Sequence, residues 1–303
     1  MKAEIAPPRD LCGWLNLDKP AGLGSTAALA RVKKYLGARK AGHAGTLDPL
    51  ASGVLPIALG AATKTAAYMM AASKRYQVLI AWGVATDSDD SEGEITARSP
   101  VRPSLEEVAA RLPDFTGIIT QTPPQFSALR VGGQRAYKLA RAGTPVTPEA
   151  RQVEIAAIRI VDAPDRDHLR LEVDCGKGVY IRALARDLGL ALGTYGHVAA
   201  LRRVCVGKFH EKDAIGLEKL DALRHSAPAS AVDLLQPLEI ALENMPALAV
   251  SAAHAVRIVQ GQAVAAPHTT DADPIWAASD GCAVAIGRVR DETFYPVRVL
   301  AVQ

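Results

Sequence analysis

The sequence predicts an α+β fold, in which a mixed, largely antiparallel central sheet with flanking helices is followed by a small β-rich domain. Three observations lead to this prediction. Apolar runs of strand length recur along the chain. Helical patterns separate only some of these runs, so the regular alternation that builds a parallel sheet is missing. Residues 244–303 contain no lysine, are rich in alanine and valine, and end in short strand-like runs at 283–289 and 295–302.

The elements of the central sheet follow from local patterns. Strands are predicted from the apolar runs at residues 13–17, 54–59, 76–84, 153–161, 169–174 and 197–206. Ser25 or Thr26 can cap a helix between the first two runs. One face of this helix is formed by Leu29, Val32 and Leu36. A second helix is predicted from the spacing of Ile181, Leu184, Ala185, Leu188 and Leu192.

These patterns divide the chain into a large domain at residues 1–243 and a small β domain at residues 244–303. Within the large domain, glycines and prolines punctuate residues 123–151, which we interpret as an irregular insertion suited to grip a ligand. Two basic runs accompany motif-bearing loops, one at residues 31–40 and one within the insertion. Such runs are commonly solvated faces, but their position here favours phosphate binding.

The other charged and apolar segments limit the class of protein. The acidic cluster at residues 87–94 lacks the spacing of an EF-hand, so we interpret it as a solvated turn, one carboxylate of which can support a site. The cysteines lie far apart, which is typical of a reduced cytosolic protein and not of a zinc or disulfide framework. The apolar stretch near residues 53–62 is too short to cross a membrane, and residues 1–10 do not resemble a signal peptide. We therefore expect a soluble cytoplasmic protein.

Most of the candidate chemistry lies in residues 41–53, AGHAGTLDPLASG. The glycines let the backbone approach a ligand closely, and Pro49 holds Asp48 on a stiff, extended turn. Asp48 can also be a turn aspartate that accepts local hydrogen bonds, and His43 a core histidine. Composition by itself favours that structural interpretation.

The order of the motifs changes this interpretation. GHAGTLDPLASG at 42–53 is followed by KRY at 74–76, GVYIRALARDLG at 178–189 and HVAALRR at 197–203. With GWLNLDKPAGLGST near the start and GVLPIALGAATK after the aspartate loop, these blocks closely resemble the TruB family of tRNA pseudouridine synthases over residues 12–210. The match is weaker near the end, where RIVQGQAV and PVRVL resemble the small PUA RNA-binding domain of that family.

The resemblance implies roles for individual residues. It makes Asp48 the catalytic aspartate, Arg182 its partner and Tyr76 the aromatic residue against the target base. It places in the substrate pocket His43, Tyr180 and Leu201. We also expect contacts to the RNA backbone from Lys19, Lys64, Arg130, Arg135, Lys138, Arg141 and Arg202. Without the family resemblance, Arg182 would be interpreted as an exposed helix residue in a row with Arg186.

The implied reaction accounts for these residue types. Pseudouridine formation breaks the N1–C1′ bond, turns the uracil and joins C5 to C1′, so no cofactor or metal is expected. One carboxylate beside the sugar suffices, whether it attacks C1′ or removes the 2′ proton. Arg182 can pair bidentately with that carboxylate and hold it ionised and oriented, and an aromatic ring can stack on the uracil. The nucleotide must be flipped out of its loop, and phosphate contacts offset that cost.

Other functions are compatible with parts of the sequence. Gly22 and Gly24 precede a helix as in a phosphate loop, but the G-x-x-x-x-G-K-[ST] pattern is missing. A non-catalytic RNA-binding or tRNA-chaperone protein would share the fold, and a chaperone role can also accompany catalysis. Intact Asp48, Tyr76 and Arg182 favour the enzyme. We expect a monomer that acts on position 55 in the T stem-loop of tRNA. We expect no guide RNA, because the long basic extensions of the guide-dependent relative are missing.

Overall fold

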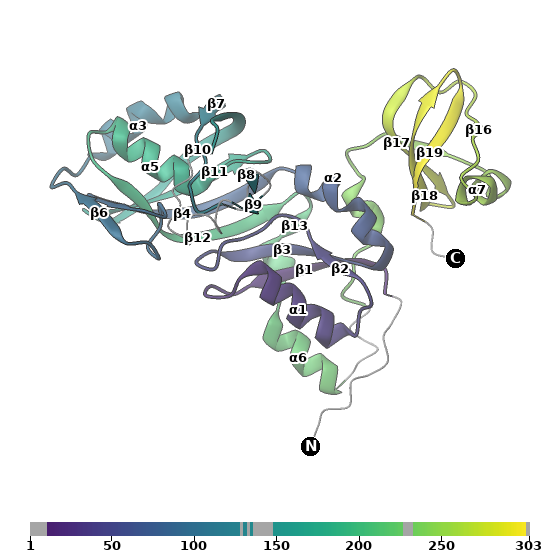
Figure 1. Ribbon diagram of the computed structural model, residues 1–303, viewed down its shortest axis with the longest axis horizontal. Coiled ribbons are helices and arrows are strands. Elements are labelled where there is room, and N and C mark those ends of the chain that lie inside the picture. The colour runs from purple at the N-terminus through teal and green to yellow at the C-terminus, as the bar shows by residue number, and fades with distance from the viewer. Residues whose placement is uncertain (1–10, 128–129, 132–133, 136–147, 227–232, 301–303) are drawn as a thin grey trace.

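The computed structural model describes residues 11–127, 130–131, 134–135, 148–226 and 233–300. Within these ranges the chain forms a ten-stranded sheet and a separate five-stranded sheet (Figure 1). Two short hairpins stand apart from both sheets, one formed by β5 (Val84–Thr86) and β6 (Ile95–Arg98), the other by β8 (Arg130–Val131) and β9 (Gln134–Arg135).

The large sheet is mixed and mostly antiparallel, as predicted. Its main path runs through β14 (Ile215–Gly216), β1 (Gly13–Lys19), β3 (Ser52–Leu59), β12 (Gly196–Val206), β4 (Lys74–Trp82), β11 (His168–Cys175), β10 (Arg151–Asp165) and β7 (Gly117–Gln121). Two short strands extend it, β2 (Ala41–His43) on β3 and β13 (Phe209–His210) on β12. Among the described strands of this sheet, only the β1–β14 and β3–β12 pairs are parallel. The run predicted at 76–84 is divided at Gly83, whose φ of 83° is in the left-handed region.

Helices pack on this sheet at two places. α1 (Ser25–Leu36) and α6 (Leu217–Ser226) lie side by side near β1, while α5 (Ile181–Ala191) packs on β12 and β4 toward the other end (Figure 1). Shorter helices are α2 (Ala66–Ala71) and α3 (Leu105–Arg111). The face of α5 predicted from its apolar spacing is buried in the main core at Ile181, Leu184, Ala185 and Leu188.

The predicted cap of the first helix is wrong. Gly24 is the N-cap of α1, and no side chain caps it. Ser25 lies inside the helix, where its Oγ accepts a hydrogen bond from Leu47 N at 2.8 Å and donates one to Leu47 O at 2.7 Å. Ser25 therefore ties α1 to the loop that carries Asp48.

The five-stranded sheet contains β15 (Ala247–Ala249), β17 (Ala272–Ser279), β18 (Cys282–Arg290), β19 (Thr293–Val299) and β16 (Val264–Ala265), in that spatial order. α7 (Ala252–Val259) packs on it, and the unit has its own apolar core, with Ile258, Val289 and Phe294 fully buried. The predicted strand runs near the end of the chain correspond to β18 and β19. In the described ranges, no helix has the length and apolar character that a membrane span requires.

Lys64 joins the two units. Its Nζ donates a hydrogen bond to Val299 O at 2.7 Å, and its carbonyl accepts one from Arg298 Nη1 at 2.9 Å. The RNA contact predicted for Lys64 does not fit this arrangement, because its ammonium group is directed at the small sheet.

Candidate active site

The loop that carries Asp48 connects β2 to β3 and is held by hydrogen bonds from Arg203 of β12. Arg203 is 1% exposed, and its Nε and Nη2 donate hydrogen bonds to Val54 O at 2.8 Å and Gly45 O at 3.0 Å. Gly53, with φ of 100°, packs so tightly on this strand that a Cβ would overlap the Arg203 carbonyl oxygen. The glycines of the motif therefore permit a close approach of the loop to β12.

Lys19 of β1 contacts the same loop, because its Nζ donates a hydrogen bond to Pro49 O at 3.5 Å. Its side chain has no exposed surface, and its Nζ donates hydrogen bonds to Leu23 O and, at 2.9 Å, Pro20 O. Burial lowers the pKa of Lys19 to about 8, an effect that the nearby Asp48 opposes. The structure contradicts the RNA contact predicted for Lys19, because a fully buried ammonium cannot reach a phosphate.

Arg182, at the start of α5, faces Asp48. Its Nε lies 2.9 Å from Asp48 Oδ2 and 3.5 Å from Asp90 Oδ2, and the Arg182 side chain is 4% exposed while that of Asp48 is 38% exposed. The predicted bidentate pairing is wrong: the two terminal nitrogens instead donate to Ser88 O at 2.7 Å and Phe126 O at 2.8 Å. The Nε–H is not aligned for a hydrogen bond, so Arg182 holds Asp48 by charge attraction.

The acidic cluster is not a solvated turn throughout. Asp90 is 4% exposed, and its Oδ1 accepts hydrogen bonds from Ser88 Oγ and, at 3.1 Å, from Glu92 N. Asp89 pairs with Arg186 Nη1 at 2.9 Å. Burial raises the pKa of Asp89 to about 6, although the positive charge of Arg186 opposes the shift. These two carboxylates are buried because α5 brings arginines to them, and Asp90 is a carboxylate that supports the site.

Asp48 opens onto a cleft of about 630 Å³. The cleft brings together five of the predicted site residues, Asp48, Tyr76, Tyr180, Arg182 and Leu201. His43 lies at the end of β2 opposite Ile57, and the described lining of the cleft does not include it. The wall also carries cationic side chains that the sequence interpretation did not assign to a site, Lys74, Lys177 and Arg203.

The apolar and aromatic walls come from three elements. Tyr76 of β4 and Leu201 of β12 are each 8% exposed. Burial raises the pKa of Tyr76, while the charge of Arg203 and its hydrogen bond to the phenol act in the opposite direction. Tyr180 is the N-cap of α5, and the guanidinium of Arg151 lies 5.2 Å from the centre of its ring. The cleft therefore offers ring faces beside one accessible carboxylate.

The remaining cations predicted to contact RNA are placed differently. Arg202 does not line the described part of the cleft, because its guanidinium pairs with Asp18 at 3.1 Å and Glu211 at 2.6 Å. Arg130 and Arg135 oppose each other in the β8–β9 hairpin, and Lys138 and Arg141 fall outside the described residues.

Lys74 is the main addition to the cations of the cleft. It is 8% exposed, donates a hydrogen bond to Met70 O at 2.8 Å, and has a pKa that burial lowers to about 8. Its place at the head of the KRY motif, like that of Arg203 at the end of HVAALRR, was the available signal in the sequence.

Comparison with known proteins matches most of the chain to one family. Residues 33–181 match the family model described as TruB family pseudouridylate synthase (N terminal domain), and residues 182–243 match that of the tRNA pseudouridylate synthase B C-terminal domain. A tRNA pseudouridine synthase B from Bradyrhizobium diazoefficiens is 54% identical over 84% of this chain and 75% of its own length. The protein of that name from Roseobacter denitrificans is 48% identical over 96% of each chain.

Solved structures show a similar fold. The archaeal box H/ACA Nop10–Cbf5 complex matches with a TM-score of 0.74 and 24% identity, covering 96% of this chain and 87% of that chain. A Cbf5–Nop10–Gar1 complex matches with a TM-score of 0.76 and 25% identity, covering 99% of this chain and 91% of that chain. The likeness extends over both sheets.

Proposed function

The chain belongs to the TruB family of pseudouridylate synthases, and on this premise we propose that it isomerises uridine to pseudouridine at position 55 in the T loop of tRNA. The observation that carries the proposal is the environment of Asp48. Its carboxylate is 38% exposed at a cleft that can hold a nucleotide, and Arg182 lies behind it at 2.9 Å. A turn aspartate without a functional role needs neither a buried arginine nor an open cleft.

Asp48 acts on the sugar of the target uridine. It either attacks C1′ to form a covalent intermediate or removes the 2′ proton to release the uracil through a glycal, and both routes need a carboxylate free to reach the ribose. Arg182 balances the charge of this carboxylate and fixes its position. The reaction is an isomerisation with no net redox change and no group donor, so the proposal includes no cofactor.

The uracil occupies the space between the apolar walls. Tyr76 presents a ring face for stacking, and Tyr180 and Leu201 complete the wall of the cleft. A base stacked within a loop cannot bring C1′ to Asp48, so the nucleotide is flipped into the cleft. His43, outside the described lining, is proposed to brace the space that the flipped nucleotide leaves.

The RNA surface is proposed around the mouth of the cleft. Arg151 and Lys177 lie on its wall, and Arg151 is the residue at which the insertion returns to the sheet. We propose that residues 123–151 grip the T stem-loop and that residues 244–303, a PUA-like unit, add affinity. The protein acts as a monomer without a guide RNA, in the cytoplasm, where bacterial tRNA matures. A chaperone activity on tRNA would use the same surface.

Release of tritium from C5-labelled uridine in a T-arm stem-loop tests the proposal. The wild-type protein is expected to release one tritium per stem-loop, and a stem-loop with cytidine at the target position serves as the control. Binding without release would favour a non-catalytic RNA-binding or chaperone protein. A requirement for an added RNA strand would contradict the guide-independent part of the proposal.

A further inference from the structure

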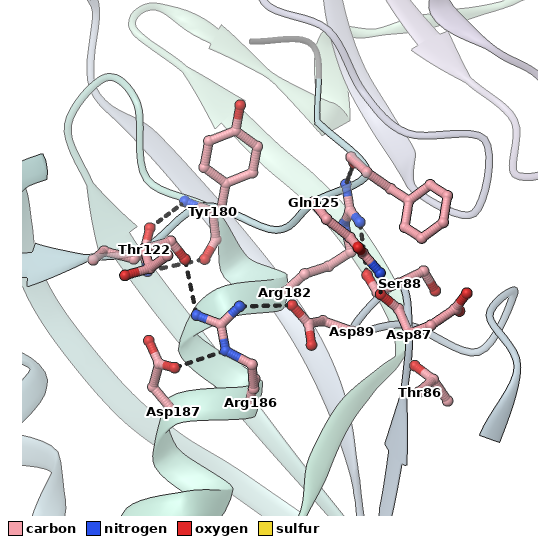
Figure 2. Close-up of polar contacts among 12 residues, drawn as sticks. Thr86, Asp87, Ser88, Asp89, Thr122, Gln125, Tyr180, Arg182, Arg186 and Asp187 are labelled. Carbon is pink, nitrogen blue, oxygen red and sulfur yellow. Dashed lines mark hydrogen bonds and ion pairs between the residues drawn. The ribbon is translucent and has the colours of Figure 1, made fainter. Parts of the chain in front are cut away.

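Two arginines one turn apart on α5 make the same kind of attachment. Arg182 joins the carboxylate of Asp90 to the carbonyl of Phe126. Arg186 joins the carboxylate of Asp89 at 2.9 Å to the carbonyl of Thr122 at 2.8 Å. Each guanidinium therefore connects the loop at residues 87–90 with the segment at residues 122–126, which begins the insertion (Figure 2).

The two attachments differ in their distance from the chemistry. Arg182 touches Asp48, whereas Arg186 does not line the described part of the cleft. Arg186 is nevertheless fully engaged, since its Nε also donates a hydrogen bond to Asp187 Oδ1 at 2.8 Å. Its side chain is 26% exposed and that of Asp89 is 12% exposed. Partly buried, charge-assisted hydrogen bonds of this kind hold geometry better than surface ion pairs.

The direction of Arg182 depends on the segments that Arg186 holds. Arg182 has no aligned hydrogen bond to Asp48 itself, and its plane is set by the carbonyls of Ser88 and Phe126. Ser88 immediately precedes Asp89, and the Phe126 segment is bound by Arg186 at Thr122. A shift of either segment therefore turns the Arg182 guanidinium relative to Asp48. Misplacement of a catalytic group by ~1 Å can reduce a rate about a hundredfold.

We propose that Arg186, through Asp89 and the Thr122 carbonyl, is a positioning residue that fixes Arg182 against Asp48 for the isomerisation. The inference rests on the proposed function. Lysine cannot replace Arg186 in this role, because the three contacts use three nitrogens of one planar fork. Neither Arg186 nor Asp89 touches the substrate in this account, so their loss is expected to slow the chemical step more than it weakens RNA binding.

Single-turnover tritium release with saturating enzyme tests this directly. The variants are Arg186→Lys and the near-isosteric Asp89→Asn, each compared with wild type, together with the double variant. Arg159→Lys is the matched control, because Arg159 also bonds two carboxylates, Glu172 at 2.9 Å and Asp174 at 2.7 Å, but outside the described cleft lining. Folding is checked by circular dichroism. An unfolded fraction lowers the amount of active enzyme, while the rate constant at saturation reports the folded molecules.

Both single variants are expected to lose at least about tenfold in the single-turnover rate constant, with Kd for the stem-loop within about threefold. The double variant should lose no more than the more impaired single variant, because both changes remove one attachment. Arg159→Lys should stay within about twofold of wild type.

Rate constants near the wild-type value in both single variants would overturn the inference, as would a loss confined to Kd or an equal loss in Arg159→Lys. An additive double variant would overturn the assignment of Asp89 as the partner. If wild type itself releases no tritium, the proposed function fails; if wild type reacts and the variants match it, only the positioning role fails.

Discussion

The two sheets of this protein differ in how they use charge. Around Asp48, the large domain buries arginines and carboxylates against each other, with Arg182 at 4% and Asp90 at 5% side-chain exposure. Residues 244–303, which carry the five-stranded sheet and which we propose as a small domain, have four arginines, five acidic residues and no lysine, a formal charge of −1, whereas residues 1–243 carry +4. Its ion pair between Arg290 and Asp271, at 3.4 Å, lies at the surface.

This difference separates two tasks. Buried and paired charges cost free energy to desolvate and are retained where geometry must be fixed. A near-neutral β-rich unit contributes contact area without a strong field, so it adds little to electrostatic attraction for a polyanion. We therefore expect changes near Asp48 to act on the chemical step and changes in the small domain to act on affinity.

The largest effect is expected from Asp48→Asn. The amide has nearly the same shape, but it can neither attack C1′ nor remove a proton, so pseudouridine formation should become undetectable while Kd for RNA stays within about tenfold of wild type. Tritium release and filter binding on the same preparation measure the two quantities. A rate within about tenfold of wild type would remove Asp48 from the reaction.

Two substitutions of Tyr76 separate its proposed role in stacking from its proposed role in proton transfer. Burial raises the pKa of its phenol, so the resting side chain is neutral. Its oxygen can therefore accept the C5 proton only if the phenol gives up its own proton to a neighbouring acceptor. We expect Tyr76→Phe to bind RNA nearly normally and to turn over at least about a hundredfold more slowly, and Tyr76→Leu to lose binding as well. Single-turnover rates compare the two variants. A Phe variant as fast as wild type would reduce Tyr76 to a stacking surface.

Lowering the pH is expected to reduce the single-turnover rate gradually, by less than the substitutions of Asp48 and Tyr76. The pKa of Asp89 is raised to about 6, mainly by burial, in the presence of Arg186, Arg182 and Asp187 on α5. The carboxylate is thus ionised above this value and becomes protonated as the pH falls through it, which removes the ion pair with Arg186. The wild-type single-turnover rate should decline between about pH 7.5 and about pH 5, and the Asp89→Asn variant should lack this part of the decline. Parallel profiles would exclude Asp89 as the titrating group.

The sequence predicted α5, the meeting of Asp48 with Arg182, and the strands that carry long apolar runs, but not β7 or β17, because apolar periodicity and motif order carry that information. It could not predict the partners of Arg182. The loop containing Asp89 and Asp90 is polar, and such a loop is normally solvated; its burial depends on arginines that lie far along the chain. The RNA contact predicted for Lys19 was wrong for a similar reason. Periodicity identifies the face of a strand on which a side chain lies, but not which loop packs over the end of that strand and buries it.

Removal of residues 244–303 is expected to change the rate constant of the chemical step less than any of the changes above. None of the proposed catalytic residues lies there, and its links to the large domain include two hydrogen bonds, one from the Lys64 ammonium to Val299 O and one from the Arg298 guanidinium to Lys64 O. The deleted protein should therefore keep its single-turnover rate constant within about threefold at saturating enzyme, while Kd for full-length tRNA rises about tenfold.

Because residues 244–303 carry a formal charge of −1, their loss should leave the slope of log Kd against log salt nearly unchanged. Arg151→Ala, by contrast, removes one proposed phosphate contact and should reduce that slope by about 1. Salt titrations of the two variants decide the comparison: a reduced slope after deletion would show that the small domain binds phosphates despite its charge, and an equal loss in the single-turnover rate would show that it helps to build the active site.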